Sequence, residues 1–330
     1  MLALKDRLTL RALAVRSLRG FFDQQHYLEI NSPTLVRAPG LEPHLRAFEL
    51  KCSRGQPHFL ITSPEFQLKR LLCAGFERIY YLGPCYRDEE HGPHHAAEFT
   101  MLEWYRSGSD SAESMIAETE ALVRATYRAL PAERRRPLAV LESADPLPQL
   151  SVSEAFARYA GLELDSDALL DADVLLDRAR RAGHVLRPGA YDQLFSELLV
   201  SAVEPRLLAE YSAVFLRDYP APLAALARLD PLNPRLAQRF ELYLCGMEIC
   251  NAFVELTDAR EQRQRFEADL AARFAIDGKR LPLDQRFLES LDAGMPVAVG
   301  NALGVDRLLV ALIDGLTTIE QVRPFAGDEL

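Results

Sequence analysis

The sequence predicts an α+β fold in which an antiparallel sheet is flanked by helices. Strand-like segments occur in clusters separated by helical blocks, and they pair as hairpins rather than alternating strictly with helices. The chain has 330 residues, of which 48% are hydrophobic and 26% are charged, so it can bury a sizeable core. We expect a single catalytic-size domain over residues 1–330, without internal repeats.

In the N-terminal half, apolar and small side chains recur at helical spacing from residue 10 to residue 21. Pro33 follows a short strand-like segment, which suits the edge of a sheet. Ser63 is expected to cap a helix that has Pro64 in its first turn. The predicted elements are a helix over 10–21, strands at 27–30 and 59–62, a helix over 63–73, a hairpin of strands at 79–89 and 98–106, and a helix over 113–130.

In the C-terminal half, residues 132–150 are rich in Pro and Arg and are expected to form a loop. The stretch 151–219 is expected to be mostly helical, with an insertion at about 151–206. The remaining predicted elements are a hairpin of strands at 240–245 and 247–256, helices over 259–274 and 283–293, and a strand at 297–303 that runs into a helix from residue 304.

The composition excludes several classes of protein. The formal net charge of −10 argues against broad binding of nucleic acid, which requires neutralisation of phosphates. The five cysteines include no CxxC pair, so neither a disulfide framework nor a structural zinc site is expected. The longest apolar stretch, Leu303–Leu316, contains three charged residues, so we expect no membrane span. We expect a cytoplasmic protein, since the N-terminus does not resemble a signal peptide.

The hairpin at 79–106 carries the densest set of candidate functional groups. Arg87 and Glu89 are two residues apart and would share a strand face, and Phe99, Glu103 and Tyr105 would alternate onto one face of the returning strand. An arginine suits a carboxylate or phosphate, and a phenylalanine can stack on a planar base. Glu103 and Tyr105 could hold a cation. The alternative is a cross-strand ladder of salt bridges without a ligand.

The second hairpin offers Glu241, Glu248 and Glu255 at equal intervals of seven. Two such carboxylates near a phosphate could bind Mg²⁺, which prefers oxygen ligands. Because seven is odd, Glu248 and Glu255 would face opposite sides of one regular strand. A bulge or a strand end must therefore lie between them if both serve one site. The alternative is a solvated strand face.

The segment Gly300–Arg307 lies at a junction between a strand and a helix. Its small residues allow a close approach of the backbone, and a helix N-terminus with an arginine can hold a phosphate. The alternative is an ordinary turn.

The order of these pieces resembles that of a known family. The helix and strand ending at Pro33, the Arg87–Glu103 hairpin and the Gly300–Arg307 turn resemble motifs 1, 2 and 3 of the class II aminoacyl-tRNA synthetases. The amino-acid sequences of residues 98–105, 240–248 and 255–262 look like those of the lysyl-tRNA synthetase catalytic domain. The resemblance implies a class II catalytic domain, with ATP and Mg²⁺ used to activate an amino acid.

Two features depart from a lysyl-tRNA synthetase. The first helix of the catalytic domain begins almost at Met1, so we expect no anticodon-binding domain. Ala302 stands where the synthetases have the middle glycine of a GxGxGxxR pattern. Together with the segment Thr62–Glu65, these features are similar to the elongation factor P (R)-β-lysine ligases. That family attaches β-lysine to a lysine side chain of the factor.

The resemblance covers nearly all 330 residues and is weakest in the insertion. It implies that Arg87 bridges the substrate carboxylate and the α-phosphate of ATP, that Phe99 stacks on adenine and that Glu89 contacts the adenine amino group or the ribose. It also implies that His95 and Arg307 hold the triphosphate. The loop Gly92–Ala97 lacks the arginine that the family places after the glycine, so the phosphate contact of this loop differs from the family's.

The resemblance assigns the other candidates to the metal and to the amino acid. Glu241 and Glu248 would bind Mg²⁺, with Asn251 beside the amino-acid carboxylate or the phosphate. The groups implied for the amines are Ser63 and Glu65 near the carboxyl end, Glu103, Tyr105 and Glu255 around the side-chain ammonium, and Ala302 beside the α-carbon.

The predicted function is ATP-dependent activation of (R)-β-lysine and its transfer to elongation factor P, by a homodimer whose interface is formed by the motif 1 segment Leu10–Pro33. The charge of −10 makes tRNA an unlikely acceptor. The alternatives are a truncated lysyl-tRNA synthetase-like enzyme that activates α-lysine for tRNA or a small molecule, an inactive sensor of amino acids or nucleotides, and an amide ligase that acts on small molecules.

Overall fold

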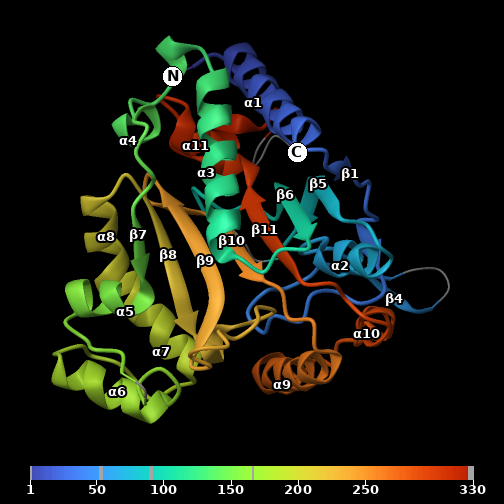
Figure 1. Cartoon of the computed structure of the whole chain (residues 1–330), viewed down its shortest axis with the longest axis vertical. Helices are drawn as coiled ribbons and strands as arrows, with labels where there is room; N and C mark the ends of the chain where they lie inside the picture. The colour runs from blue at the N-terminus through green and yellow to red at the C-terminus, as the bar shows by residue number, and fades with distance from the viewer. Residues whose placement is uncertain (1, 52–54, 89–91, 166, 326–330) are drawn as a thin grey trace.

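The computed structural model describes residues 2–51, 55–88, 92–165 and 167–325. A large mixed sheet forms its centre, with the strand order β1-β5-β6-β11-β10-β9-β8-β7 (Figure 1). Its strands are β1 (Leu28–Glu29), β5 (Arg78–Tyr86), β6 (Glu98–Ser107), β11 (Ala298–Gly304), β10 (Met247–Val254), β9 (Leu236–Leu244), β8 (Ala213–Pro220) and β7 (Gln149–Ser151). The interior pairs are antiparallel, as predicted. The two edge strands add parallel pairs, β1 with β5 and β7 with β8.

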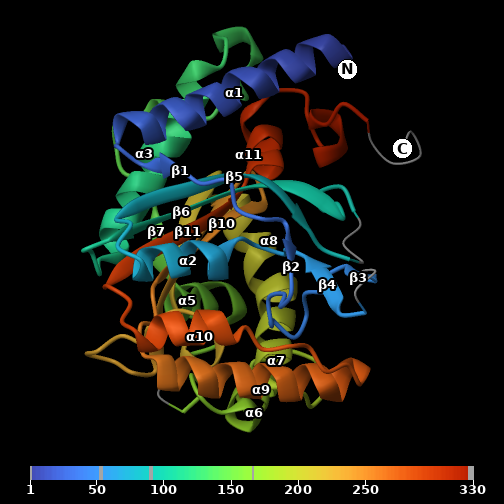
Figure 2. The same cartoon turned by 90° about the vertical axis from the view of Figure 1, so that its right-hand side faces the viewer.

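Helices cover both faces of this sheet (Figure 2). One face carries α1 (Leu4–Gln24), α3 (Ala112–Ala129) and α11 (Val305–Leu312), and the other carries α2 (Glu65–Cys73), α9 (Ala259–Asp277) and α10 (Gln285–Asp292). The rings of Phe22 and Tyr80 stack at a centroid distance of 4.6 Å and join α1 to β5. The expected architecture, α+β with a mainly antiparallel sheet between helices, is confirmed.

The smaller elements surround this frame. A second sheet has the order β2-β4-β3, with β2 (Leu35–Val36), β4 (Pro57–Leu60) and β3 (Glu49–Lys51). The short helical turns are η1 (Ala132–Arg134), α4 (Ala139–Glu142), η4 (Ala221–Leu223) and η5 (Ile319–Val322). Within the described residues, no helix has both the length and the apolar character required to cross a membrane.

The insertion forms a helical layer beside β8 and has its own apolar core. It contains α5 (Val152–Ala155), η2 (Phe156–Ala160), α6 (Ala172–Arg181), α7 (Tyr191–Leu198), η3 (Leu199–Val203) and α8 (Glu204–Glu210). The prediction of a mostly helical stretch up to residue 219 is wrong at its end, because Ala213–Pro220 is the buried strand β8. A short apolar run that is covered on both faces has no alternating pattern, so periodicity alone cannot distinguish it from a helix.

The start of α2 determines the position of two charged side chains. The helix begins at Glu65, one turn after β4, and Pro64 occupies the cap position that was predicted for Ser63. Ser63 still acts on the helix, since its Oγ accepts a hydrogen bond of 3.1 Å from the backbone N–H of Glu65. Four residues further along, Lys69 lies on the same helix face as Glu65. This face is directed towards the sheet.

Candidate active site

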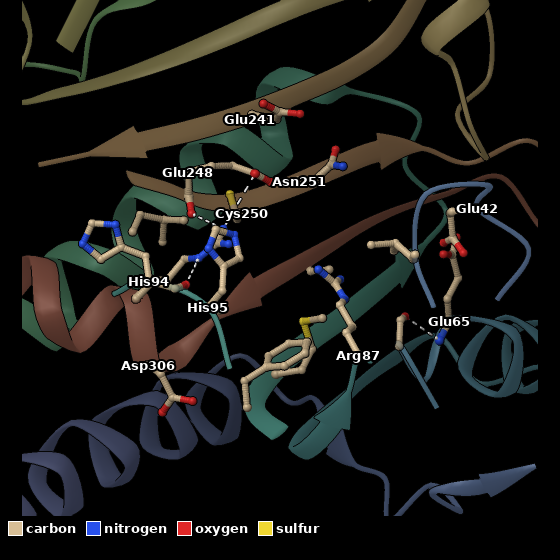
Figure 3. A pocket seen from close by; sticks show the side chains of 18 of the residues that line it. Glu42, Glu65, Arg87, His94, His95, Glu241, Glu248, Cys250, Asn251 and Asp306 are labelled. Atoms are coloured by element: carbon tan, nitrogen blue, oxygen red, sulfur yellow. Dashed lines mark hydrogen bonds and ion pairs between the residues drawn. The ribbon is translucent and has the colours of Figure 1, made fainter. Parts of the chain in front are cut away.

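A cavity of about 440 Å³ lies between the central strands and the loops at one side of the sheet (Figure 3). This volume suits a small-molecule or nucleotide ligand. The predicted residues that line it are Ser63, Glu65, Arg87, His95, Phe99, Glu241, Glu248, Asn251, Ala302 and Arg307. Glu103, Tyr105 and Glu255 are buried next to it, as described below. Glu89 lies outside the described residues.

Arg87 is placed at the end of β5 by a backbone hydrogen bond of 2.9 Å to the carbonyl of Ala97. Its guanidinium lies 5.0 Å from the centre of the Phe99 ring. Within the described part of the chain its Nε has no hydrogen-bond partner. Figure 3 shows the side chain between Glu248 and Asn251 on one side and Glu65 and Glu42 on the other. The guanidinium is therefore available to an anionic ligand.

Arg307 joins the loop that follows β5 to β10. Its Nε donates to the carbonyl of His94 at 3.1 Å, and its Nη1 donates to the carbonyl of Glu248 at 3.0 Å. The carboxylate of Glu248 lies 3.7 Å from the same Nη1. Because the side chain lines the cavity as well, it presents positive charge to a ligand from the first turn of α11.

The residue before Arg307 connects three elements of the fold. Asp306 is buried, and its Oδ1 accepts from Arg11 of α1 at 2.5 Å while its Oδ2 accepts from the backbone N–H of Thr100 at 2.8 Å. Arg11 also donates to the Thr100 hydroxyl at 2.6 Å. Thr100 follows Phe99 in β6, so this cluster fixes α1, β6 and α11 against one another beside the aromatic ring.

Glu241 and Glu248 come from β9 and β10. The pairing of these strands shifts between Glu248 and Cys250, and β10 ends at Val254, so both a bulge and a strand end, the two alternatives that the spacing left open, lie between Glu248 and Glu255. Glu241 accepts from Arg239 at 2.6 Å and from the Tyr243 hydroxyl at 2.9 Å. The Glu248 side chain is 41% exposed, and its partial burial, with the charge of Glu241 second, raises its pKa.

This pair of carboxylates fits a magnesium ion that is shared with a substrate. A divalent cation would relieve the repulsion that raises the pKa of Glu248. No group of three or more His, Cys, Asp or Glu side chains able to hold a metal occurs among the described residues. Mg²⁺ commonly takes one or two carboxylates and completes its ligands with phosphate oxygens and water. The pair therefore suits Mg²⁺ bound together with a nucleotide.

A second cluster of carboxylates, which we call the acidic recess, lies beside Ser63 and comprises Glu65, Glu103 and Glu255. Glu103 and Glu255 are each 1% exposed. Glu103 accepts hydrogen bonds of 2.7 Å from Ser63 Oγ and from the Tyr105 hydroxyl. Burial, with the charge of Glu65 second, raises the pKa of Glu103 to about 8. Burial also raises the pKa of Glu255 to about 7, against the opposing effect of Lys69.

Two neighbours of the recess were not singled out from the sequence. The ammonium of Lys69 is buried and pairs with Glu65 and, at 2.5 Å, with Glu255. Gly300 of β11 leaves the space that Tyr105 and Glu255 occupy, since a Cβ there would lie 2.3 Å from the ring and 2.4 Å from Glu255 Oε1. The sequence feature that could have identified Lys69 is its position four residues after Glu65, which places both side chains on one face of a helix.

Arg239 and Glu42 also line the cavity without having been predicted. Arg239 lies two residues before Glu241, on the same face of β9, and this spacing could have identified it. Glu42 lies in a loop with no periodic pattern. Burial and the charge of Glu65 raise its pKa. Arg239 therefore adds a guanidinium beside Glu241 at one end of the cavity, and Glu42 adds a carboxyl beside Glu65 at the other.

Comparison with known proteins places the chain in a family. The family model described as tRNA synthetases class II (D, K and N) matches residues 2–329. The chain is also similar to curated proteins named elongation factor P–(R)-β-lysine ligase. Those of Vibrio cholerae, Proteus mirabilis and Erwinia tasmaniensis are 35%, 37% and 39% identical to it, over 97%, 96% and 91% of this chain and 95%, 93% and 89% of their own lengths. The chain therefore belongs to the class II tRNA synthetase family and, within it, to the group of the elongation factor P–(R)-β-lysine ligases.

Proposed function

We propose that this protein is an ATP-dependent ligase that activates (R)-β-lysine as an acyl-adenylate and transfers it to a lysine side chain of elongation factor P. The observation that carries the proposal is the adjacency of a cavity lined by three arginines and an acidic recess, joined through Ser63 and Glu65. The cavity suits the phosphates of ATP together with a carboxylate, and the recess suits ammonium groups. The names of the similar proteins support this substrate and this acceptor.

The reaction has two steps. In the first, a carboxylate oxygen of the substrate attacks the α-phosphorus of ATP in line, the bond to the β-phosphate oxygen breaks, and pyrophosphate leaves. Both reactants are anionic, so alignment and positive charge lower the barrier more than acid–base catalysis does. In the second step, the neutral amine of the acceptor lysine attacks the acyl carbon, and AMP leaves. The amine loses its proton to solvent as the amide forms.

In this proposal the nucleotide end of the site consists of five side chains. Arg87 bridges the substrate carboxylate and the α-phosphate, and Phe99 stacks on adenine. His95 and Arg307 contact the triphosphate. Asn251 lies beside the reacting carboxylate, where its Oδ1 accepts from Arg239 at 3.2 Å.

The metal in this proposal is Mg²⁺. Glu241 and Glu248 would hold it, and when bound it would neutralise phosphate charge. Arg239 and Tyr243 orient the Glu241 carboxylate for this role through the hydrogen bonds described above.

The amino-acid end consists of the acidic recess and its neighbours. Ser63 and Glu65 receive the amine nearer the carboxyl end, and Glu103, Tyr105 and Glu255 surround the distal ammonium. Glu255 Oε1 is buried, and among the described residues it accepts no hydrogen bond, which favours an incoming donor at that atom.

We further propose that residues 1–330 act as one catalytic unit, that two chains form a homodimer, and that the enzyme works in the cytoplasm, where translation takes place. The motif 1 segment Leu10–Pro33, which holds most of α1 and all of β1, supports the dimer. Leu28 of the edge strand β1 is 51% exposed, so an apolar side chain is available on this segment, and Leu4 at the start of α1, just before the segment, is 45% exposed.

Exchange of labelled pyrophosphate into ATP tests the first step. The assay should be run with a panel of amino acids that includes both lysine regioisomers, and β-lysine should support the fastest exchange. Arg87→Ala should reduce exchange at least 100-fold, because loss of a charge-bearing donor in the transition state costs about 3 kcal/mol. Arg128→Ala, which alters an exposed arginine on α3, is the matched control. Near-normal exchange in Arg87→Ala would contradict the assignment.

A further inference from the structure

The acidic recess contains its own cation. Lys69 is 1% exposed, and its ammonium forms ion pairs with Glu65, one turn earlier on α2, and with Glu255 just after β10. The ammonium also lies 6.0 Å from the centre of the Tyr105 ring. A lysine is almost never buried to this degree unless it is paired. The roles proposed for the substrate pocket leave this residue without an assignment.

Charge balance in the recess suggests what the lysine does. When the carboxyls of Glu65, Glu103 and Glu255 are all ionised, they face one ammonium and two negative charges remain uncompensated, in keeping with the raised pKa values of Glu103 and Glu255 in the free protein. The substrate proposed above carries two ammonium groups in addition to its carboxylate. Binding of this diammonium ligand would therefore neutralise the recess, whereas a ligand with a single ammonium would leave one buried carboxylate unpaired.

The surroundings of Lys69 show which of these carboxylates it affects most. Glu255 is packed against Gly300 of β11, and the Lys69 ammonium lies 2.5 Å from its Oε2. Among the described residues, no other group donates to either oxygen of Glu255, so Lys69 is the cation that compensates its charge. Glu103, by contrast, has Ser63 and Tyr105 as donors. The titratable and charged groups around the Lys69 ammonium are Glu65 and Cys73 on α2, Glu255 after β10, Glu103 and Tyr105 on β6, and Glu42 beside Glu65.

We propose that Lys69 is a positioning residue of the substrate pocket: its buried ammonium holds the carboxylates of Glu65 and Glu255 in place by ion pairing and sets the charge of the recess to match a ligand with two ammonium groups. The selection of a diamino acid in this statement rests on the proposed function. The role of Lys69 as an internal counter-ion does not, because it follows from the ion pairs and their burial.

The dependence of stability on pH tests the proposal. A neutral side chain at position 69 removes the cation, so a neighbouring carboxyl would hold a proton in the ligand-free fold near neutral pH, whereas the unfolded chain would not. The free energy of unfolding of Lys69→Met should therefore fall more steeply with rising pH, between about pH 5 and pH 8, than that of the unaltered protein, by the equivalent of about one further bound proton. Chemical denaturation across this range measures the slope. Arg70→Met removes the adjacent positive charge on α2 and should keep the slope of the unaltered protein. Equal slopes in all three proteins would overturn the proposal.

A second measurement applies if Lys69→Met does not fold or if neither lysine regioisomer binds. Lys69→Ala leaves a space that propylammonium or 1-propanol could fill, and these two molecules are similar in size but differ in charge. Propylammonium should raise the melting temperature of Lys69→Ala by several degrees more than 1-propanol does, whereas the unaltered protein should not distinguish the two. Equal shifts would assign Lys69 to packing alone and overturn the counter-ion role. A lack of binding by either lysine would count against the proposed function and not against this role.

Discussion

Ala302 directs a methyl group towards the cavity, between Glu103 on β6 and Asn251 on β10, which are its partners in the two neighbouring strands. A glycine at this position would leave room beside the α-amino group of α-lysine. β-Lysine carries that amine one carbon further from the carboxylate and avoids the methyl. A difference of this size in a pocket changes relative rates about 10- to 200-fold.

We therefore expect Ala302→Gly to raise kcat/KM for α-lysine while changing kcat/KM for β-lysine much less. Pyrophosphate exchange with each isomer measures the ratio. Ala252→Gly, which removes a buried methyl from the neighbouring strand β10, controls for a general loosening of the sheet. An unchanged ratio in Ala302→Gly would assign the methyl to stiffening of the strand.

At the same scale, sequence patterns predict the residues that lie in strands better than those that depend on neighbouring elements. The alternation along β6 correctly groups Glu103 with Tyr105, because strand periodicity alone fixes a shared face. The role of Lys69 depends on where α2 packs against the sheet, close to Glu255, and nothing local to residues 65–69 shows this. An identical spacing on an exposed helix would form an ordinary surface ion pair.

Among the elements, α1 is tied to the nucleotide end of the site through Arg11. Its bonds to Asp306 and Thr100 hold β6 and α11 in register beside Phe99 and Arg307. We expect Arg11→Met to raise the KM for ATP roughly tenfold, because charge-assisted hydrogen bonds contribute about 1.5–3 kcal/mol. The KM for β-lysine should remain within about twofold. Steady-state kinetics with each substrate varied separately tests this.

Arg19→Met is the matched control on the same helix. Arg19 pairs with Glu29, but both side chains are about 40% exposed, and exposed pairs contribute little. If both variants raise the KM for ATP equally, the cluster around Asp306 has no specific role.

The elements also show where sequence reasoning succeeds and fails. Parity predicts that a bulge or a strand end lies between Glu248 and Glu255 if both serve one site, and the structure has a bulge after Glu248 and the end of β10 at Val254. Strand β8 was missed because its apolar run is covered by the insertion on one face and by the main core on the other. At the two edges of the sheet, β1 pairs in parallel with β5 and β7 pairs in parallel with β8. These pairings depend on contacts between distant segments, which local patterns do not encode.

For the whole molecule, the acidic recess predicts an unusual dependence of stability on pH. The pKa values of Glu103 and Glu255 are raised in the fold to about 8 and about 7, so the native state binds more protons than the unfolded chain between pH 4.5 and 8. Stability from these groups is present at low pH and is lost as the pH rises. The raised pKa of Asp269, about 6, acts in the same direction.

We expect the free energy of unfolding of the ligand-free protein to fall between about pH 5 and pH 8, and β-lysine to stabilise the protein more at pH 8 than at pH 6. Chemical denaturation across this range measures both effects. Glu103→Gln should flatten the slope. A free energy of unfolding that rises throughout the range would contradict the burial of ionisable carboxyls in the recess.

The quaternary structure gives a further prediction at this scale. Sedimentation at micromolar concentration should show a dimer, because stable two-fold interfaces commonly bury exposed apolar patches such as that on the motif 1 segment. Leu28→Glu should shift the protein towards the monomer, since it introduces charge on the exposed edge strand β1. A monomer at the same concentration without any substitution would contradict the proposed interface.

Identification of the molecule that accepts the activated lysine is the most direct test of the proposed function. The protein should be incubated with labelled β-lysine, ATP and Mg²⁺, together with either purified elongation factor P or bulk tRNA, and the label should then be counted in each acceptor. We expect efficient transfer to the factor, with loss of transfer when its acceptor lysine is replaced by arginine, and no stable label on tRNA. Efficient labelling of tRNA with none on the factor would contradict it.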